Sequence, residues 1–197
     1  MAKLDRLVWT AGFSFTSYGV IIGVRSNRAE VVEQARSFLP PLWTPSTGRK
    51  VELLYSFISG GNSTRPGIRR FNILYANAAR AARSLDMEEV FQAFESDLQL
   101  YVAERAPRRV FVHAGVVGWR GRAILLPGRT FTGKTTLVAE LVRAGATYYS
   151  DEYAVLDAQG RAHPYTRPLA IRPADGGRSQ KHKVEELGGR SGVKPLP

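Results

Sequence analysis

The stretch Gly128-Arg129-Thr130-Phe131-Thr132-Gly133-Lys134-Thr135 decides the fold of this chain of 197 residues. Four residues separate its two glycines, and a lysine and a hydroxyl residue follow, so that backbone N–H groups can converge on an anion. Residues 122–126 before it favour a β-strand, and residues 137–142 after it keep helical spacing of apolar side chains. The pattern predicts an α/β fold in which the N-terminus of a helix points at a bound phosphate.

The loop predicts a site for the phosphates of a nucleoside triphosphate, ATP with Mg²⁺. Lys134 adds a positive charge to the loop amides, and Thr135 offers a hydroxyl to the metal ion. The expected phosphate-binding residues are Gly128, Arg129, Thr130, Phe131, Thr132, Gly133, Lys134, Thr135 and Thr136. Thr135 and Glu152 are the expected ligands of Mg²⁺.

An acidic pair, Asp151-Glu152, follows the strand-like residues 146–150. A helix over residues 134–144 descends about 16 Å, and five strand residues climb about the same distance. A right-handed crossover puts this strand in one sheet with residues 122–126, so that Asp151 emerges level with the phosphates. One carboxylate could accept a proton from an attacking hydroxyl and the other could hold Mg²⁺. The alternative is a solvated pair at a strand end.

A histidine lies upstream of the loop in a second β-type run. Residues 110–117 and 122–126 predict a hairpin, whose register pairs His113 with Pro127 at the loop entrance. There the imidazole could contact the nucleotide, the metal-bound water or an acceptor. The alternative is a core histidine with satisfied hydrogen bonds.

The composition narrows the classes of function. The chain has no cysteine, which excludes disulfides, thiolate metal sites and a thiol nucleophile. Its formal net charge of +11 predicts attraction to polyanions, but aromatic residues are not interleaved with the basic ones, so nucleic acid is an unlikely partner. No apolar run approaches the roughly 18 residues that span a bilayer. We expect a cytoplasmic protein with no membrane partner.

Three regions are expected along the chain. Residues 1–106 predict an N-terminal α+β lobe, residues 107–173 the nucleotide-binding core, and residues 174–197, which are polar and rich in glycine, a flexible tail. In the lobe, strands are expected over residues 13–24, 51–58 and 70–75, and helices starting at Asn27 and Asp86. In the core, further strands are expected over residues 147–156 and 169–172.

Residues 113–172 resemble the catalytic domain of HPr kinase/phosphorylase and its smaller bacterial relatives, including peptide-modifying kinases associated with lasso-peptide biosynthesis. The matching residues are His113-Ala114-Gly115-Val116, the loop 128–135, Asp151-Glu152 and Leu169-Ala170-Ile171-Arg172. The resemblance implies an HPr kinase/PEP carboxykinase-like P-loop fold, a mixed sheet with flanking helices. It also implies transfer of a phosphoryl group from ATP to a serine hydroxyl of a protein or peptide.

The resemblance also implies residue roles. Asp151 would be the base, His113 would lie in the active site, and Arg172 would stabilise developing phosphoryl charge. The N-terminal lobe could recognise the acceptor, and the chain could form a homo-oligomer. Glu152 stands where the family usually has a second aspartate, and we expect neither the complete phosphorylase machinery nor the family's C-terminal helices.

Two other functions are compatible with the motifs. An ATP- or GTP-hydrolysing switch would use the acidic pair to orient water instead of a hydroxyl. A non-catalytic module that binds nucleotide or nucleic acid would use the basic charge and would not need Asp151. The kinase would transfer phosphate to an acceptor, the switch would release phosphate, and the binding module would only bind, so these outcomes distinguish the three functions.

Overall fold

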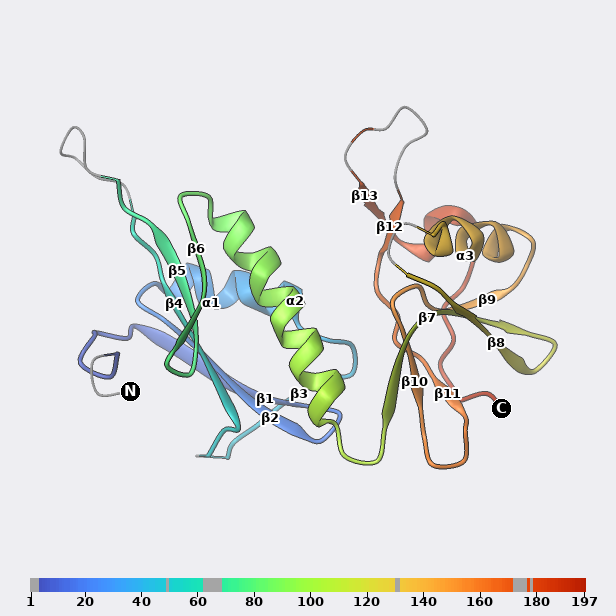
Figure 1. The fold of residues 1–197 in the computed structure, drawn as a ribbon, viewed down its shortest axis with the longest axis horizontal. Coiled ribbons are helices and arrows are strands. Elements are labelled where there is room, and N and C mark those ends of the chain that lie inside the picture. Colours follow the sequence, from blue (N-terminus) through green and yellow to red (C-terminus); the bar gives the residue numbers. More distant parts are fainter. Residues whose placement is uncertain (1–3, 49, 62–68, 130–131, 172–176, 178) are drawn as a thin grey trace. The chain divides into compact units, whose positions relative to one another are not determined.

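The computed structural model describes residues 4–48, 50–61, 69–129, 132–171, 177 and 179–197. The chain has a mixed α/β structure with several sheets and few helices (Figure 1). It divides into two compact units, Met1–Pro107 and Arg108–Pro197, next to the expected boundary between residues 106 and 107. In the described ranges, no helix combines the length and the apolar character needed to cross a membrane.

Unit 1 is built on a six-stranded sheet in the order β3-β1-β2-β4-β5-β6. Its strands are β1 (Ala11–Ser17), β2 (Val20–Ser26), β3 (Thr44–Pro45), β4 (Leu53–Ile58), β5 (Asn72–Ala76) and β6 (Ala79–Ser84). The predicted strand over residues 13–24 is instead the β1–β2 hairpin. Tyr18 and Gly19 have φ of 48° and 87°, the left-handed conformations that a tight two-residue turn requires.

The helices of unit 1 are α1 (Ala29–Ala35), the short 3-10 helix η1 (Arg36–Phe38) and α2 (Met87–Arg105). The predicted start of α2 is confirmed, because the Asp86 carboxylate accepts a hydrogen bond of 2.9 Å from the Glu88 N–H. The expected cap at Asn27 is wrong. Its side-chain amide instead donates to the Ser59 carbonyl and accepts from the Ser59 N–H, which joins the ends of β2 and β4.

One face of the unit 1 sheet is covered by α2 (Figure 1). Phe91 and Phe94 of the helix are fully buried against β4. The ring of Phe94 lies edge-on to Tyr55, with centroids 4.9 Å apart, and the ring of Phe91 lies 5.4 Å from that of Phe57. The apolar face of this helix is therefore part of the core of the unit.

Unit 2 is organised around the long strand β7 (Figure 1). Its elements are β7 (Val110–Trp119), β8 (Arg122–Pro127), α3 (Lys134–Arg143), β9 (Thr147–Ser150), β10 (Tyr153–Leu156), β11 (Ala162–His163), β12 (Leu169–Ile171), β13 (Gln180–His182) and the 3-10 helix η2 (Val184–Leu187). Strand β8 pairs with one edge of β7, while β9 and β10 pair with the other edge in succession. Strand β11 pairs with β10, and β12 pairs with β13.

The crossover through α3 sets the position of the loop. Strands β8 and β9 both run antiparallel to β7, so they run parallel to each other with β7 between them. The connecting helix packs closely on β7, where a Cβ at Gly115 would lie 2.7 Å from Cγ2 of Val138. A glycine at this position thus permits the close approach of α3 to the sheet.

The register of the β7–β8 hairpin differs by one residue from the prediction. Pro127 lies opposite Ala114, not His113. The reason is the turn, in which Arg120 and Gly121 both have positive φ and form the two-residue connection between Trp119 and Arg122.

The expectation of a flexible tail is wrong for residues 179–197. Leu196 exchanges two backbone hydrogen bonds with Ala162, of 2.7 and 3.0 Å, and Val184 is buried in the core beneath α3. The Tyr148 N–H donates to the Arg190 carbonyl at 2.9 Å. A few apolar residues and backbone pairings are enough to fold this segment onto the unit, although its average composition is polar.

Candidate functional site

The loop between β8 and α3 depends on glycine at two positions for different reasons. Gly133 precedes α3 with φ of 85°, a conformation that other residues rarely adopt. A Cβ at Gly128 would lie 2.7 Å from Oγ1 of Thr132, so this side of the loop has no room for a side chain. The Thr132 hydroxyl donates to the Arg129 carbonyl at 2.7 Å. Thr130 and Phe131 lie outside the described residues.

Lys134 folds back over this loop. Its ammonium donates to the carbonyls of Gly128 and Arg129 at 2.6 and 2.7 Å. These are carbonyl acceptors of the loop itself, so an incoming phosphate would compete with them for the ammonium. Thr136 is exposed in the first turn of α3.

Asp151 lies beside the first turn of α3. Its Oδ2 accepts a hydrogen bond from the Thr135 hydroxyl at 3.2 Å, and its Oδ1 accepts one from the Tyr148 hydroxyl at 3.0 Å. Burial raises the pKa of Asp151, and hydrogen bonds from Tyr148, Thr135 and the Ala170 N–H oppose this rise. The structure thus brings the acidic residue and the hydroxyl of the loop together.

The backbone explains how the acidic pair reaches this position. Ser150 at the end of β9 lies opposite Val116, and Tyr153 at the start of β10 lies opposite His113. Asp151, between them, therefore comes opposite Gly115. The buried Ser150 hydroxyl accepts from the N–H groups of Glu152 and Tyr153 at 3.1 and 3.0 Å. The predicted strand over residues 147–156 is therefore two strands with a hydrogen-bonded turn that carries the acids.

Glu152 shares the poorly solvated environment of its neighbour. Burial and then the negative charge of Asp151 raise the pKa of Glu152 to about 7, while the charge of Lys181 in β13 acts in the opposite direction. Two adjacent carboxyl groups that resist full ionisation favour a site that binds a cation or a proton.

His113 is exposed on β7, and its ring lies edge-on to Tyr153 with centroids 6.0 Å apart. Partial burial lowers the pKa of His113, and the positive charge of Lys134 lowers it further. The imidazole is therefore held neutral on the loop side of the sheet. Arg172 lies outside the described residues, directly after the end of β12.

Two residues of this site were missed from the sequence. Tyr148 has a relative exposure of only 1%, and its hydroxyl contacts Asp151. The Arg167 carbonyl lies 2.8 Å from the Tyr148 hydroxyl and shares its single proton with Asp151, and burial lowers the pKa of the Arg167 guanidinium to about 10. A tyrosine in a buried strand was the available signal, because its hydroxyl needs a polar partner.

The side chains around Asp151 are suited to Mg²⁺. The Thr135 hydroxyl and the carboxylates of Asp151 and Glu152 are oxygen donors, the type that this ion prefers. Among the described residues there is no group of three or more His, Asp or Glu side chains arranged to hold a metal. Mg²⁺ at nucleotide sites needs no such group, because one or two carboxylates with the substrate phosphates are enough.

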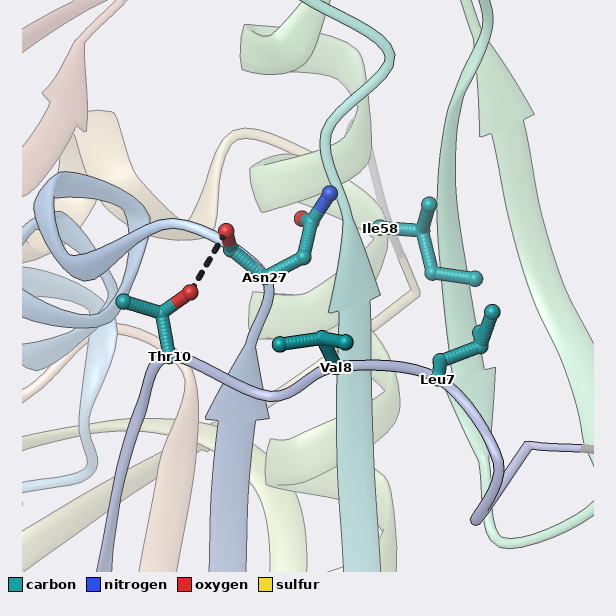
Figure 2. A pocket seen from close by; sticks show the side chains of 5 residues that line it. All are labelled: Leu7, Val8, Thr10, Asn27 and Ile58. Carbon is teal, nitrogen blue, oxygen red and sulfur yellow. Dashed lines mark hydrogen bonds between the residues drawn. The ribbon is translucent and has the colours of Figure 1, made fainter.

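A pocket of about 360 Å³ in unit 1 has a different character (Figure 2). It is lined by Leu7, Val8, Thr10, Asn27 and Ile58. Val8 is 84% exposed, and the Thr10 hydroxyl is already engaged with the Asn27 carbonyl at 3.0 Å. None of these five lining residues is charged.

Within the loop that the sequence predicted for phosphate binding, Thr135 contacts Asp151 and the charge of Lys134 acts on His113. The resemblance to HPr kinase rests on these motif residues and stays a prediction. Comparison of the chain with protein-family models, curated proteins and solved structures found no match.

Proposed function

We propose that this chain is an ATP-dependent kinase of the HPr kinase type, which transfers the γ-phosphoryl group to a serine hydroxyl of a protein or peptide. The observation that carries the proposal is the 3.2 Å hydrogen bond between the Thr135 hydroxyl and the Asp151 carboxylate. It joins the end of a phosphate-binding loop to a carboxylate that burial makes more basic. An acid at this distance from the loop supports a reaction at the terminal phosphate.

The loop and α3 would hold the triphosphate. The backbone N–H groups around Gly133 and the N-terminus of α3 would bind phosphate oxygens, and the Lys134 ammonium would exchange its two carbonyl acceptors for the phosphate. Thr135 and Glu152 would hold Mg²⁺, which when bound neutralises phosphate charge. The proposed P-loop fold of the HPr kinase/PEP carboxykinase type follows from the same strand, loop and helix.

Asp151 would act as the base. The serine hydroxyl gives its proton to the Asp151 carboxylate while its oxygen forms a bond to the γ-phosphorus. The bond from the γ-phosphorus to the bridging oxygen breaks, and ADP leaves. The raised pKa of Asp151 makes it a better proton acceptor than an ordinary aspartate, and neutral His113 could donate a hydrogen bond to the acceptor or the phosphate.

The experiment is transfer of labelled γ-phosphate from ATP with Mg²⁺ into proteins and peptides of an extract of the source cells. Native chain should label a distinct acceptor, and Lys134→Ala and Asp151→Asn should abolish the label. Glu140→Gln is the matched control, because this carboxylate lies on the exposed side of α3 and pairs with Arg143. Release of phosphate without labelling would instead support the hydrolase, and labelling that survives in Asp151→Asn would contradict the assigned base.

A further inference from the structure

Two adjacent tyrosines of β9 provide a natural comparison. Tyr148 lies in the buried cluster beneath α3, and its hydroxyl is 3.0 Å from Oδ1 of Asp151 and 2.8 Å from the Arg167 carbonyl. Tyr149 lies in the cluster that contains Ala114 and Leu196, and its hydroxyl donates to the Lys194 carbonyl at 2.7 Å. Both phenols make a short polar contact, but only the first one reaches the acidic pair.

A bulge in β9 brings Tyr148 to Asp151. Residues three apart in a regular strand point to opposite faces of a sheet. Here the register against β7 shifts between Val116 and Val117, so that the residue between Tyr148 and Ser150 is extra. The shift puts Tyr148 and Asp151 on the same side. Bulges of this kind often re-aim a side chain next to an active site.

The contacts of Asp151 fix the orientation of its carboxylate. Tyr148 holds Oδ1, while Oδ2 faces Thr135 in the first turn of α3. With its Oδ1 contact in place, the carboxylate cannot rotate freely about its Cβ–Cγ bond. Without the Tyr148 hydroxyl, Oδ1 would lose this contact and the carboxylate would be held by Thr135 and the backbone near Ala170, although the ring could still fill the core.

We propose that Tyr148 is a positioning residue, whose hydroxyl holds Oδ1 of Asp151 so that Oδ2 faces the phosphate-binding loop and the acceptor hydroxyl. The inference rests on the proposed kinase function. It assigns to Tyr148 a role in turnover, not in the binding of ATP, because the hydroxyl contacts the proposed base.

The test compares Tyr148→Phe with Tyr149→Phe. The two residues are neighbours in β9, and each substitution removes one hydroxyl from a buried tyrosine. The rate is expressed per ATP-binding site, so that unfolded protein does not contribute. Tyr148→Phe should lower kcat by about tenfold or more and change the KM for ATP by less than about twofold, while Tyr149→Phe should keep the native kcat.

The outcomes separate this inference from the proposed function. Absence of phosphate transfer by the native chain would overturn both. Native transfer with an unchanged kcat in Tyr148→Phe would overturn the positioning role alone. An equal loss of kcat in the two phenylalanine variants, or a change confined to KM, would also overturn it, because the hydroxyl would then serve only the fold or the binding of nucleotide.

Discussion

Replacement of Glu152 by glutamine should remove the pH dependence of stability that this residue creates. Its pKa is raised from 4.5 to about 7 in the folded chain. Between these values the folded state holds a proton that the unfolded state has lost, so the free energy of unfolding falls as pH rises. The stability that the protonated Glu152 contributes is complete below pH 4.5 and is lost above about pH 7. The size of the shift corresponds to at most about 3 kcal/mol.

Urea denaturation between pH 5 and pH 8 in metal-free buffer measures this effect. The native chain should lose up to about 3 kcal/mol relative to Glu152→Gln across the range, and the variant should be the more stable protein at pH 8. Any pH dependence that unit 1 adds to the free energy of unfolding is the same in both proteins, so it cancels when the variant is compared with the native chain. Glu140→Gln, at an exposed position, should follow the native profile. Parallel profiles of native chain and Glu152→Gln would refute the reasoning from the buried pair.

Three further predictions concern the loop and the core of unit 2. Gly115→Ala should destabilise the chain by about 1–3 kcal/mol in urea denaturation, because its Cβ would lie 2.7 Å from Val138; native stability would contradict this packing. Deletion of residues 183–197 should lower the thermal midpoint of unit 2, since it removes Val184 from the core and the backbone pairing of Leu196; an unchanged midpoint would show that the segment is dispensable. Thr135→Val should weaken ATP binding about tenfold with Mg²⁺ but little with EDTA, as calorimetry can test; equal losses would exclude the hydroxyl as a metal ligand.

Local signals in the sequence predicted the elements that position the site. The start of α2 follows from Asp86, whose side chain caps the helix. The position of Asp151 follows from chain lengths, because α3 and β9 return the chain to the level of the loop. These features depend on a few neighbouring residues, and that is why the sequence contains enough information to predict them.

Other elements lack the usual local signals in the sequence. Strand β6 is rich in alanine and has little strand propensity, yet it pairs with β5 along its whole length. The turn of the β1–β2 hairpin uses Tyr18 at positive φ, where glycine or asparagine is usual.

The contact of Tyr148 with Asp151 could not be read from spacing. In a regular strand the two side chains would lie on opposite faces, and the bulge that changes this is set by pairing with β7. The folding of residues 179–197 likewise depends on partners such as Ala162 and Tyr148, far away in the sequence.

Equilibrium binding of ATP and of AMP to the native chain and to Lys134→Ala tests the central claim most directly. The account predicts that ATP binds in the presence of Mg²⁺, that AMP binds far more weakly because it lacks the β- and γ-phosphates, and that Lys134→Ala loses the preference for ATP. Among the described residues, the hydrogen bonds of the ammonium go to loop carbonyls, so the variant should keep its fold. Equal affinity of both proteins for ATP, or equal affinity of the native chain for ATP and AMP, would contradict the assignment of residues 128–135 as a triphosphate site.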